Sequence, residues 1–151
     1  IPRALNLLKH ALRVTGISTF YRTPAFSGGN QPPFYNGVIA AETDLPPRSV
    51  KFDMLRNIEE ELGRRRGEDR FAPRTIDLDL ILYADLIVEE PELTLPDPDI
   101  ARRAFLAVPL CELAPELSLP DGRPICAIAA ELDTLSLEPL PKFTALLREH
   151  R

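Results

Sequence analysis

The chain has 151 residues, of which 44% are hydrophobic and 27% charged, and this composition predicts one soluble globular domain spanning residues 1–151. A net charge of −5 argues against a partner that is nucleic acid or an anionic membrane, and no apolar run approaches the roughly 20 residues of a membrane helix. The two cysteines lack a metal-binding spacing and indicate no secreted disulfide scaffold, so we expect a cytoplasmic protein.

The first third of the sequence predicts a helix followed by an antiparallel pair of strands. Residues 2–14 carry apolar side chains at helical spacing, and Gly16 is expected to end that helix. Residues 17–23 and 34–43 are rich in β-branched and aromatic residues and predict two strands. The loop between them is long and rich in proline and glycine, which is typical of a binding loop and equally of a plain surface loop.

A second helix and an acidic strand follow. Residues 44–63 predict the clearest helix, in which we expect two of the three glutamates at 59–61 to face solvent. Residues 74–83 alternate aspartate with aliphatic residues and predict a strand, with a hairpin turn at Ala84 and Asp85.

The remaining sequence predicts a short helix after Pro98, a turn at 120–122 and a helix within 125–135, whereas the tail is weakly patterned. Helix, strand, strand, helix, strand is the βαββαβ order without its opening strand. We therefore predict an α+β, ferredoxin-like sandwich whose first strand is missing from a chain that begins at Ile1 without methionine.

Asp77 and Asp79 lie two positions apart, so a strand would hold both carboxylates on one face. Shared protonation or a bound divalent metal would relieve their repulsion, and magnesium favours such oxygen ligands. The alternative is a strand whose outer face simply meets solvent.

Five arginines precede the aspartates within eleven residues, and a further pair, Arg102 and Arg103, follows them. Guanidinium groups grip phosphate oxygens, so metal ligands beside them suggest phosphoryl transfer. The alternatives are a solvated loop or contact with RNA, and the net charge argues against RNA. The sequence contains no Walker-type phosphate loop.

Phe34, Asn36 and Phe105 form another candidate group. Two aromatic faces can sandwich a flat heterocycle while an amide reads its edge. Burial in a hydrophobic core is the alternative for the aromatic residues.

Five segments together resemble the 6-hydroxymethyl-7,8-dihydropterin pyrophosphokinase family, over roughly residues 3–123. They are FYRTPAF, NQPPFYNGVIAAET, IEEELGRRR, FAPRTIDLDLILY and LPDPDIARRAFLAVPLCELAPEL. The resemblance implies a ferredoxin-like fold, two magnesium ions, and transfer of pyrophosphate from ATP to the pterin in folate biosynthesis, with release of AMP.

The resemblance also implies roles for individual residues. Asp77 and Asp79 would hold the metals and would be catalytic together with Arg64 and Arg74. Phe34, Asn36 and Phe105 would bind the pterin, assisted by Thr23 and Pro24. The residues that would contact ATP are Glu59, Arg66, Arg70, Phe71, Leu80, Asp97 and Arg103.

The chain departs from the family pattern at three places. Asp97 stands where the family usually has a histidine near the phosphates, and Phe71 stands where a tryptophan is frequent. An acid at 97 would repel phosphate unless it turns away or meets a metal. The family's opening strand and Gly-Ser-Asn turn are absent, so we expect this chain to be poorly active and to associate through an open edge, but to be a monomer at full length.

Two other functions remain open from the residues alone. One is a metal-dependent nucleotidyltransferase, and the other is a non-catalytic ferredoxin-like binding module. The products formed from ATP and a pterin would separate these readings.

Overall fold

A computed structural model describes residues 1–25, 31–63 and 76–150. The helices among them are α1 (Pro2–Ala11), η1 (Ser49–Leu55), α2 (Arg56–Glu61), η2 (Pro98–Ala101), α3 (Ala104–Leu113), α4 (Ile125–Glu131) and α5 (Pro141–Glu149). The strands are β1 (Arg13–Ile17), β2 (Tyr21–Thr23), β3 (Phe34–Asn36), β4 (Ile39–Glu42), β5 (Val88–Glu90), β6 (Leu93–Leu95) and β7 (Glu138–Pro139).

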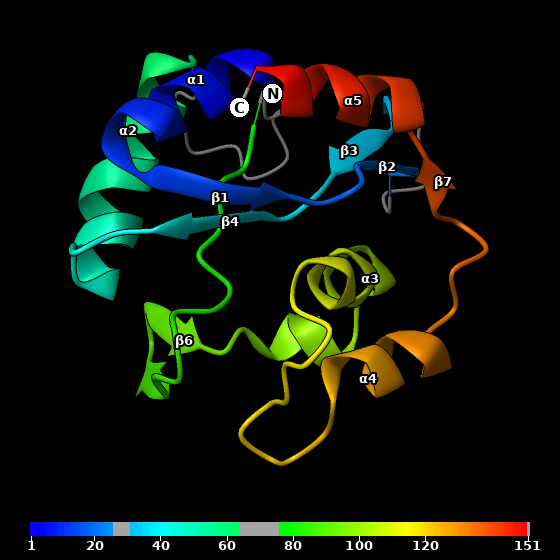
Figure 1. The fold of residues 1–151 in the computed structure, drawn as a ribbon. Coiled ribbons are helices and arrows are strands. Elements are labelled where there is room, and N and C mark those ends of the chain that lie inside the picture. The colour runs from blue at the N-terminus through cyan, green and yellow to red at the C-terminus, as the bar shows by residue number, and fades with distance from the viewer. Residues whose placement is uncertain (26–30, 64–75, 151) are drawn as a thin grey trace.

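The arrangement is mixed helix and antiparallel sheet, which confirms the predicted α+β class. The β1–β4 pair crosses the middle of the molecule, with α1 and α5 on one side and α3 and α4 on the other (Figure 1). A second sheet has the order β3–β2–β7, and β5 pairs with β6. Among the described residues, no helix is long and apolar enough to cross a membrane.

The predicted antiparallel pair is confirmed, but it is divided into two ladders. β1 pairs with β4 and β2 pairs with β3, and the chain between them leaves the ladder at Ser18–Phe20. Ser18 replaces the missing ladder contacts, because its backbone N–H donates to the Val38 carbonyl while its hydroxyl accepts from the Val38 N–H. Its side chain is fully buried, so both interactions are shielded from water.

The first helix ends earlier than the sequence predicts. It stops at Ala11, and Gly16 lies inside β1 rather than at a helix end. β1 pairs with β4 through an irregularity between Val14 and Gly16, and this tertiary pairing overrides the local helical pattern. A Cβ on Gly16 would approach a Leu113 methyl at 3.1 Å, so the small residue also suits close packing against α3.

The second helix is confirmed, with a π-helical first part, η1, that runs into α2. Leu55 and Ile58 belong to an apolar stripe at helical spacing along residues 54–62, and both are buried together with Val50 against Leu8 of α1. Glu60 and Glu61 face solvent, whereas Glu59 is buried. The expectation of two solvated glutamates is therefore confirmed.

The prediction of an acidic strand is wrong in one respect. Residues 76–83 form no ladder with any described strand and are therefore not a β-strand in the structure. Leu78 and Leu80 nevertheless pack onto the η1–α2 cluster, so the aliphatic alternation still buries one side. The turn at Ala84 is present with a positive φ of 47°, but the strand after it, β5, pairs with β6.

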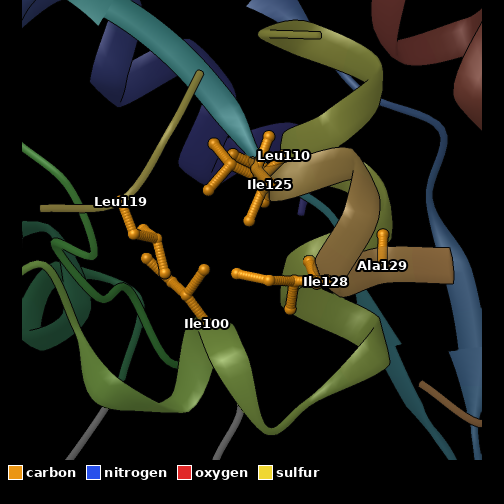
Figure 2. Close-up of a cluster of buried hydrophobic side chains, with 8 residues drawn as sticks. Ile100, Leu110, Leu119, Ile125, Ile128 and Ala129 are labelled. Atoms are coloured by element: carbon orange, nitrogen blue, oxygen red, sulfur yellow. The ribbon is translucent and has the colours of Figure 1, made fainter. Parts of the chain in front are cut away.

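The largest hydrophobic cluster lies between η2, α3 and α4. Figure 2 shows its side chains converging from these elements and from the preceding turn; the labelled members are Ile100, Leu110, Leu119, Ile125, Ile128 and Ala129. A disulfide joins Cys111 of α3 to Cys126 of α4, which the sequence did not predict. The helices within this cluster are thus tied covalently as well as by burial.

The tail is more ordered than its pattern predicts. β7 adds to the free edge of β2, and α5 packs its buried Leu147 against Leu5, Ile17 and Phe20. Phe143 and Leu147 lie four residues apart on α5, and this spacing after Pro141 is the signal that could have identified the helix.

Gly37 provides a test of the packing under the β2–β3 hairpin. A Cβ at this position would lie 2.6 Å from two atoms of the buried Phe20 ring. We expect Gly37→Ala to lower the free energy of unfolding by about 1–3 kcal/mol, because Phe20 must move within a filled core. Denaturant unfolding measures the loss. Gly16→Ala is the matched control and should cost less, because the 3.1 Å contact there is to a flexible leucine methyl; equal losses would contradict the packing argument.

Candidate active site

One cavity of about 660 Å³ lies between the β2–β3 hairpin, residues 77–84 and the start of α3. Its lining includes residues that are far apart in sequence but were all predicted as site residues. These are Thr23, Phe34, Asn36, Asp77, Asp79, Leu80, Asp97 and Phe105. The fold therefore brings the acidic pair and the aromatic–amide group to the same cavity.

The acidic segment is held from beneath by Glu59. The carboxylate of this buried side chain accepts a hydrogen bond of 2.7 Å from the backbone N–H of Leu78. Leu78 is the residue between the two aspartates, so the bond fixes the backbone from which both carboxylates project. Buried charge-assisted hydrogen bonds of this kind are strong and directional.

Asp79 is in an unfavourable place for an ionised carboxylate. Partial burial at the cavity wall raises its pKa most, followed by the charges of Asp77, Glu59 and Asp97, while Lys51 lowers it. The group thus has a raised pKa in a site that concentrates negative charge. A cation bound here would find carboxylate oxygens already gathered.

Two carboxylates match the donor set that magnesium takes from a protein when water and phosphate complete its shell. Within residues 1–25, 31–63 and 76–150, no three histidine, cysteine or acidic side chains are grouped to enclose a metal. The aspartate pair therefore suits an ion that arrives with a phosphate ligand better than an ion fully enclosed by protein.

Asp97 has a structural contact as well as a place in the cavity wall. Its Oδ1 accepts a 2.9 Å hydrogen bond from the backbone N–H of Asp99 and so caps η2. Its own backbone N–H donates to the Ile81 carbonyl at 2.8 Å, which ties η2 to the acidic segment. One oxygen of the carboxylate is therefore turned toward the helix.

The aromatic–amide group is built on the short β2–β3 ladder. Thr23 lies opposite Phe34, and Asn36 lies opposite Tyr21. Asn36 Nδ2 donates to the hydroxyl oxygen of buried Thr23 at 2.8 Å, and this bond fixes the orientation of the amide. Phe34 is 46% exposed and Phe105 half-buried, so neither ring is consumed by the core.

Some predicted site residues lie away from this cavity or outside the described ranges. Pro24 and Arg103 are exposed, and Arg103 precedes α3 as its N-cap residue; neither lines the cavity, and nor does Glu59. The remaining predicted residues fall outside the residues that the structure describes: Arg64, Arg66, Arg70, Phe71 and Arg74.

A second cavity of about 240 Å³ adjoins the first at Asp79, Leu80 and Asp97. Its lining adds Lys51 and Thr94, which sequence reasoning missed. Lys51 looks like an ordinary solvated helix residue in the sequence, and only the packing of η1 against the β5–β6 hairpin brings it here, where its ammonium group donates to the Glu92 carbonyl. It is the one lysine or arginine among the described residues that line either cavity.

Comparison with known proteins shows to which family the chain is similar. The family model of 7,8-dihydro-6-hydroxymethylpterin-pyrophosphokinase matches residues 1–115. A Pseudomonas aeruginosa protein named 2-amino-4-hydroxy-6-hydroxymethyldihydropteridine pyrophosphokinase is 39% identical over 129 residues, which are 85% of this chain and 78% of that protein. A Haemophilus influenzae protein of the same name is 36% identical over 85% of this chain and 79% of that protein.

A third relative is much longer. The Schizosaccharomyces pombe folic acid synthesis protein fol1 is 36% identical over 122 residues, which cover 80% of this chain but 16% of that protein. The segment that the family model matches, residues 1–115, includes the hairpin and the acidic segment that line the cavity. The chain belongs to the 7,8-dihydro-6-hydroxymethylpterin-pyrophosphokinase family.

Proposed function

We propose that this chain transfers pyrophosphate from ATP to 6-hydroxymethyl-7,8-dihydropterin in folate biosynthesis, using magnesium and releasing AMP. The observation that carries the proposal is the single cavity in which Asp77 and Asp79 face the same space as Phe34, Asn36 and Phe105. The family supplies the reaction class, and the cavity supplies a site for each substrate.

The hairpin and α3 would bind the pterin. Phe34 and Phe105 offer their ring faces to a flat heterocycle, and stacking of this kind contributes both buried area and a preferred geometry. Asn36 gives one amide hydrogen to Thr23, which leaves the other hydrogen and the carbonyl oxygen for the edge of the ring. Thr23 would thus orient the amide, and Pro24 would shape the neighbouring backbone.

Asp77 and Asp79 would hold the magnesium ions, of which we propose two. Bound with ATP, magnesium would neutralise phosphate charge and the repulsion of the carboxylates. Glu59 would keep both aspartates in place through the backbone of Leu78, and Leu80 would lie on the nucleotide side. Glu59 therefore supports the ATP site from behind.

The transfer would be in line and without a covalent enzyme intermediate. The hydroxymethyl oxygen would attack the β-phosphorus, and the bond from that phosphorus to the oxygen bridging to the α-phosphate would break. AMP would leave with that oxygen, and the hydroxyl proton would pass to water. Arg64 and Arg74 would stabilise the transferring group, and Arg66, Arg70, Phe71 and Arg103 would contact ATP. We also propose a monomeric state and a cytoplasmic location, the latter without support from the cysteines, because Cys111 and Cys126 form a disulfide.

A product assay tests the proposed function directly. The chain is incubated with ATP, magnesium and the pterin, and nucleotide products are separated by chromatography. We expect AMP and the pterin diphosphate in equal amounts. Inorganic pyrophosphate with a nucleotidylated acceptor would indicate a nucleotidyltransferase instead, and ATP binding without AMP release would indicate a non-catalytic binding module.

The aspartates provide the first mutational prediction. Asp77→Asn and Asp79→Asn should each abolish AMP release, because the ligand charge for the metal is lost. Neither should lower thermal stability, because each substitution removes one of two like charges that repel each other. The raised pKa of Asp79 means that folding stability falls as the pH rises from the unfolded-state pKa to the folded-state pKa of this carboxyl, and stays lowered above it. Asp85→Asn, at an exposed turn, is the control and should leave turnover unchanged. Near-normal turnover in both site variants would refute the metal-ligand assignment.

The aromatic residues Phe34 and Phe105 provide the second mutational prediction. Phe34→Ala and Phe105→Ala should each weaken pterin binding by about 1–3 kcal/mol through lost stacking and burial. Calorimetric titration with the pterin and, separately, with MgATP measures both affinities. The affinity for ATP should change far less; equal losses for the two ligands would point to a damaged core.

Asp97 provides the third mutational prediction. Asp97→Asn keeps an oxygen acceptor for the Asp99 N–H but removes a negative charge from the cavity wall. We expect MgATP to bind about two- to fivefold more tightly, the size of one screened charge interaction. Asp97→Ala also removes the cap and should reduce stability by about 0.5–2 kcal/mol. Weaker MgATP binding by the asparagine variant would mean that the carboxylate itself takes part in the nucleotide site.

A further inference from the structure

The C-terminal segment contacts the hairpin that carries Thr23, Phe34 and Asn36. β7 pairs with the edge of β2 that β3 does not occupy, with Tyr21 opposite Pro139 and Arg22 opposite Glu138. A salt bridge of 3.1 Å joins Arg22 to Glu138. The short β2 strand is therefore held on both edges, and one of them depends on residues near the end of the chain.

The backbone between β1 and β2 is also held by this segment. The N–H of Phe20 donates to the hydroxyl oxygen of Thr144 at 2.9 Å, and the Phe20 carbonyl accepts from the N–H of Leu140 at 2.8 Å. Arg148 Nε donates to the Ile17 carbonyl at 3.0 Å. Thr144 is 2% exposed, so its bond to Phe20 is formed out of contact with water and would be costly to leave unmade.

Ring packing continues from α5 into the site. Phe143 meets Phe20 edge to face and also contacts Tyr35 on β3, with ring centroids 5.8 Å apart in each pair. Phe20 in turn lies so close to Gly37 that no Cβ fits between them. Gly37 and Tyr35 are the two chain neighbours of Asn36, so both sides of this residue rest on rings that α5 supports.

We propose that Thr144 and Phe143 are positioning residues for the pterin, and that α5 sets the hairpin at the separation from Phe105 that a stacked heterocycle needs. The inference rests on the proposed function, because Thr23, Phe34 and Asn36 are the residues proposed to read the pterin. The family model matches residues 1–115, so α5 lies beyond the segment that this model matches. In this proposal α5 makes no contact with the pterin and acts by positioning the hairpin that does.

A purely structural role for α5 predicts a different result. If α5 only stabilises the fold, its variants should melt at lower temperature while the folded fraction binds pterin normally. If α5 positions the hairpin, the affinity for pterin should fall even in the fully folded protein, because a small displacement of aligned groups is enough to lose their contacts. The ATP side of the cavity lies on residues 77–80 and η2. Leu78 and Leu80 pack in a different hydrophobic cluster from the one that contains Phe143 and Leu147 of α5, so the affinity for ATP should be spared.

The experiment uses Thr144→Val, which keeps the shape of the side chain and removes the oxygen acceptor. Pterin affinity is measured calorimetrically in the presence of α,β-methylene ATP, which cannot transfer its pyrophosphate, at a temperature where every variant is folded. We expect the dissociation constant for pterin to rise about fivefold, the size of one hydrogen bond or stacking contact to the pterin lost when the hairpin shifts, with the constant for the nucleotide within twofold of the unaltered chain. Thr144→Ser restores the hydroxyl and should restore the affinity.

Two further variants complete the test. Phe143→Leu keeps an apolar side chain but loses both ring contacts, and it should weaken pterin binding by a similar factor, which covers the case in which Thr144→Val does not fold. Ile128→Val lies on α4, outside the cluster that contains Phe20 and Leu147, and serves as the control; it should lower the melting temperature without changing pterin affinity. Unchanged pterin affinity in Thr144→Val and Phe143→Leu would overturn this inference but leave the proposed function standing. Failure of the unaltered chain to bind pterin would overturn the proposed function, and this inference with it.

Discussion

The hydrogen bond from Leu78 to the buried Glu59 carboxylate is the constraint on which the rest of the site depends. The acidic segment has no ladder partner among the described strands, and this bond holds its backbone midway between Asp77 and Asp79. The apolar alternation buries Leu78 and Leu80 against η1 and α2, and the Glu59 bond then sets the height of the backbone above that surface. Hydrophobic packing determines which face of the acidic segment lies against η1 and α2, and the hydrogen bond to Glu59 fixes the position of its backbone.

The site thus combines two kinds of support. On the proposed metal-binding side, neighbouring carboxylates and partial burial raise the pKa of Asp79, and an ion bound with phosphate would relieve the repulsion between these charges. The proposed pterin side consists of a buried threonine, an oriented amide and two accessible rings. If these assignments hold, affinity would depend mainly on charge on the first side and on shape on the second.

Much of this could be predicted from the sequence, because the signals were local. Alternating aspartate and leucine and the apolar stripe of residues 54–62 each follow from spacing along one element. The grouping of Phe105 with Phe34 and Asn36 joins two elements, and the resemblance to the family supplied their shared role. The end of α1 could not be predicted this way, because β-pairing with β4 overrode a helical pattern that continued to Val14. Burial of Glu59 among three consecutive glutamates depends on a partner 19 residues away, and no local pattern encodes such a contact.

The C-terminal helix was the largest omission, and its contacts show why. Thr144, Leu140 and Arg148 bond to main-chain atoms of residues 17–20 rather than to their side chains. For these three bonds, the amino acid at the receiving position can change without disturbing the bond, unlike the side-chain packing of Phe20 against Phe143 and Leu147. Residues joined in this way would leave no covariation between them across related sequences, although the two segments are mechanically coupled in the folded protein.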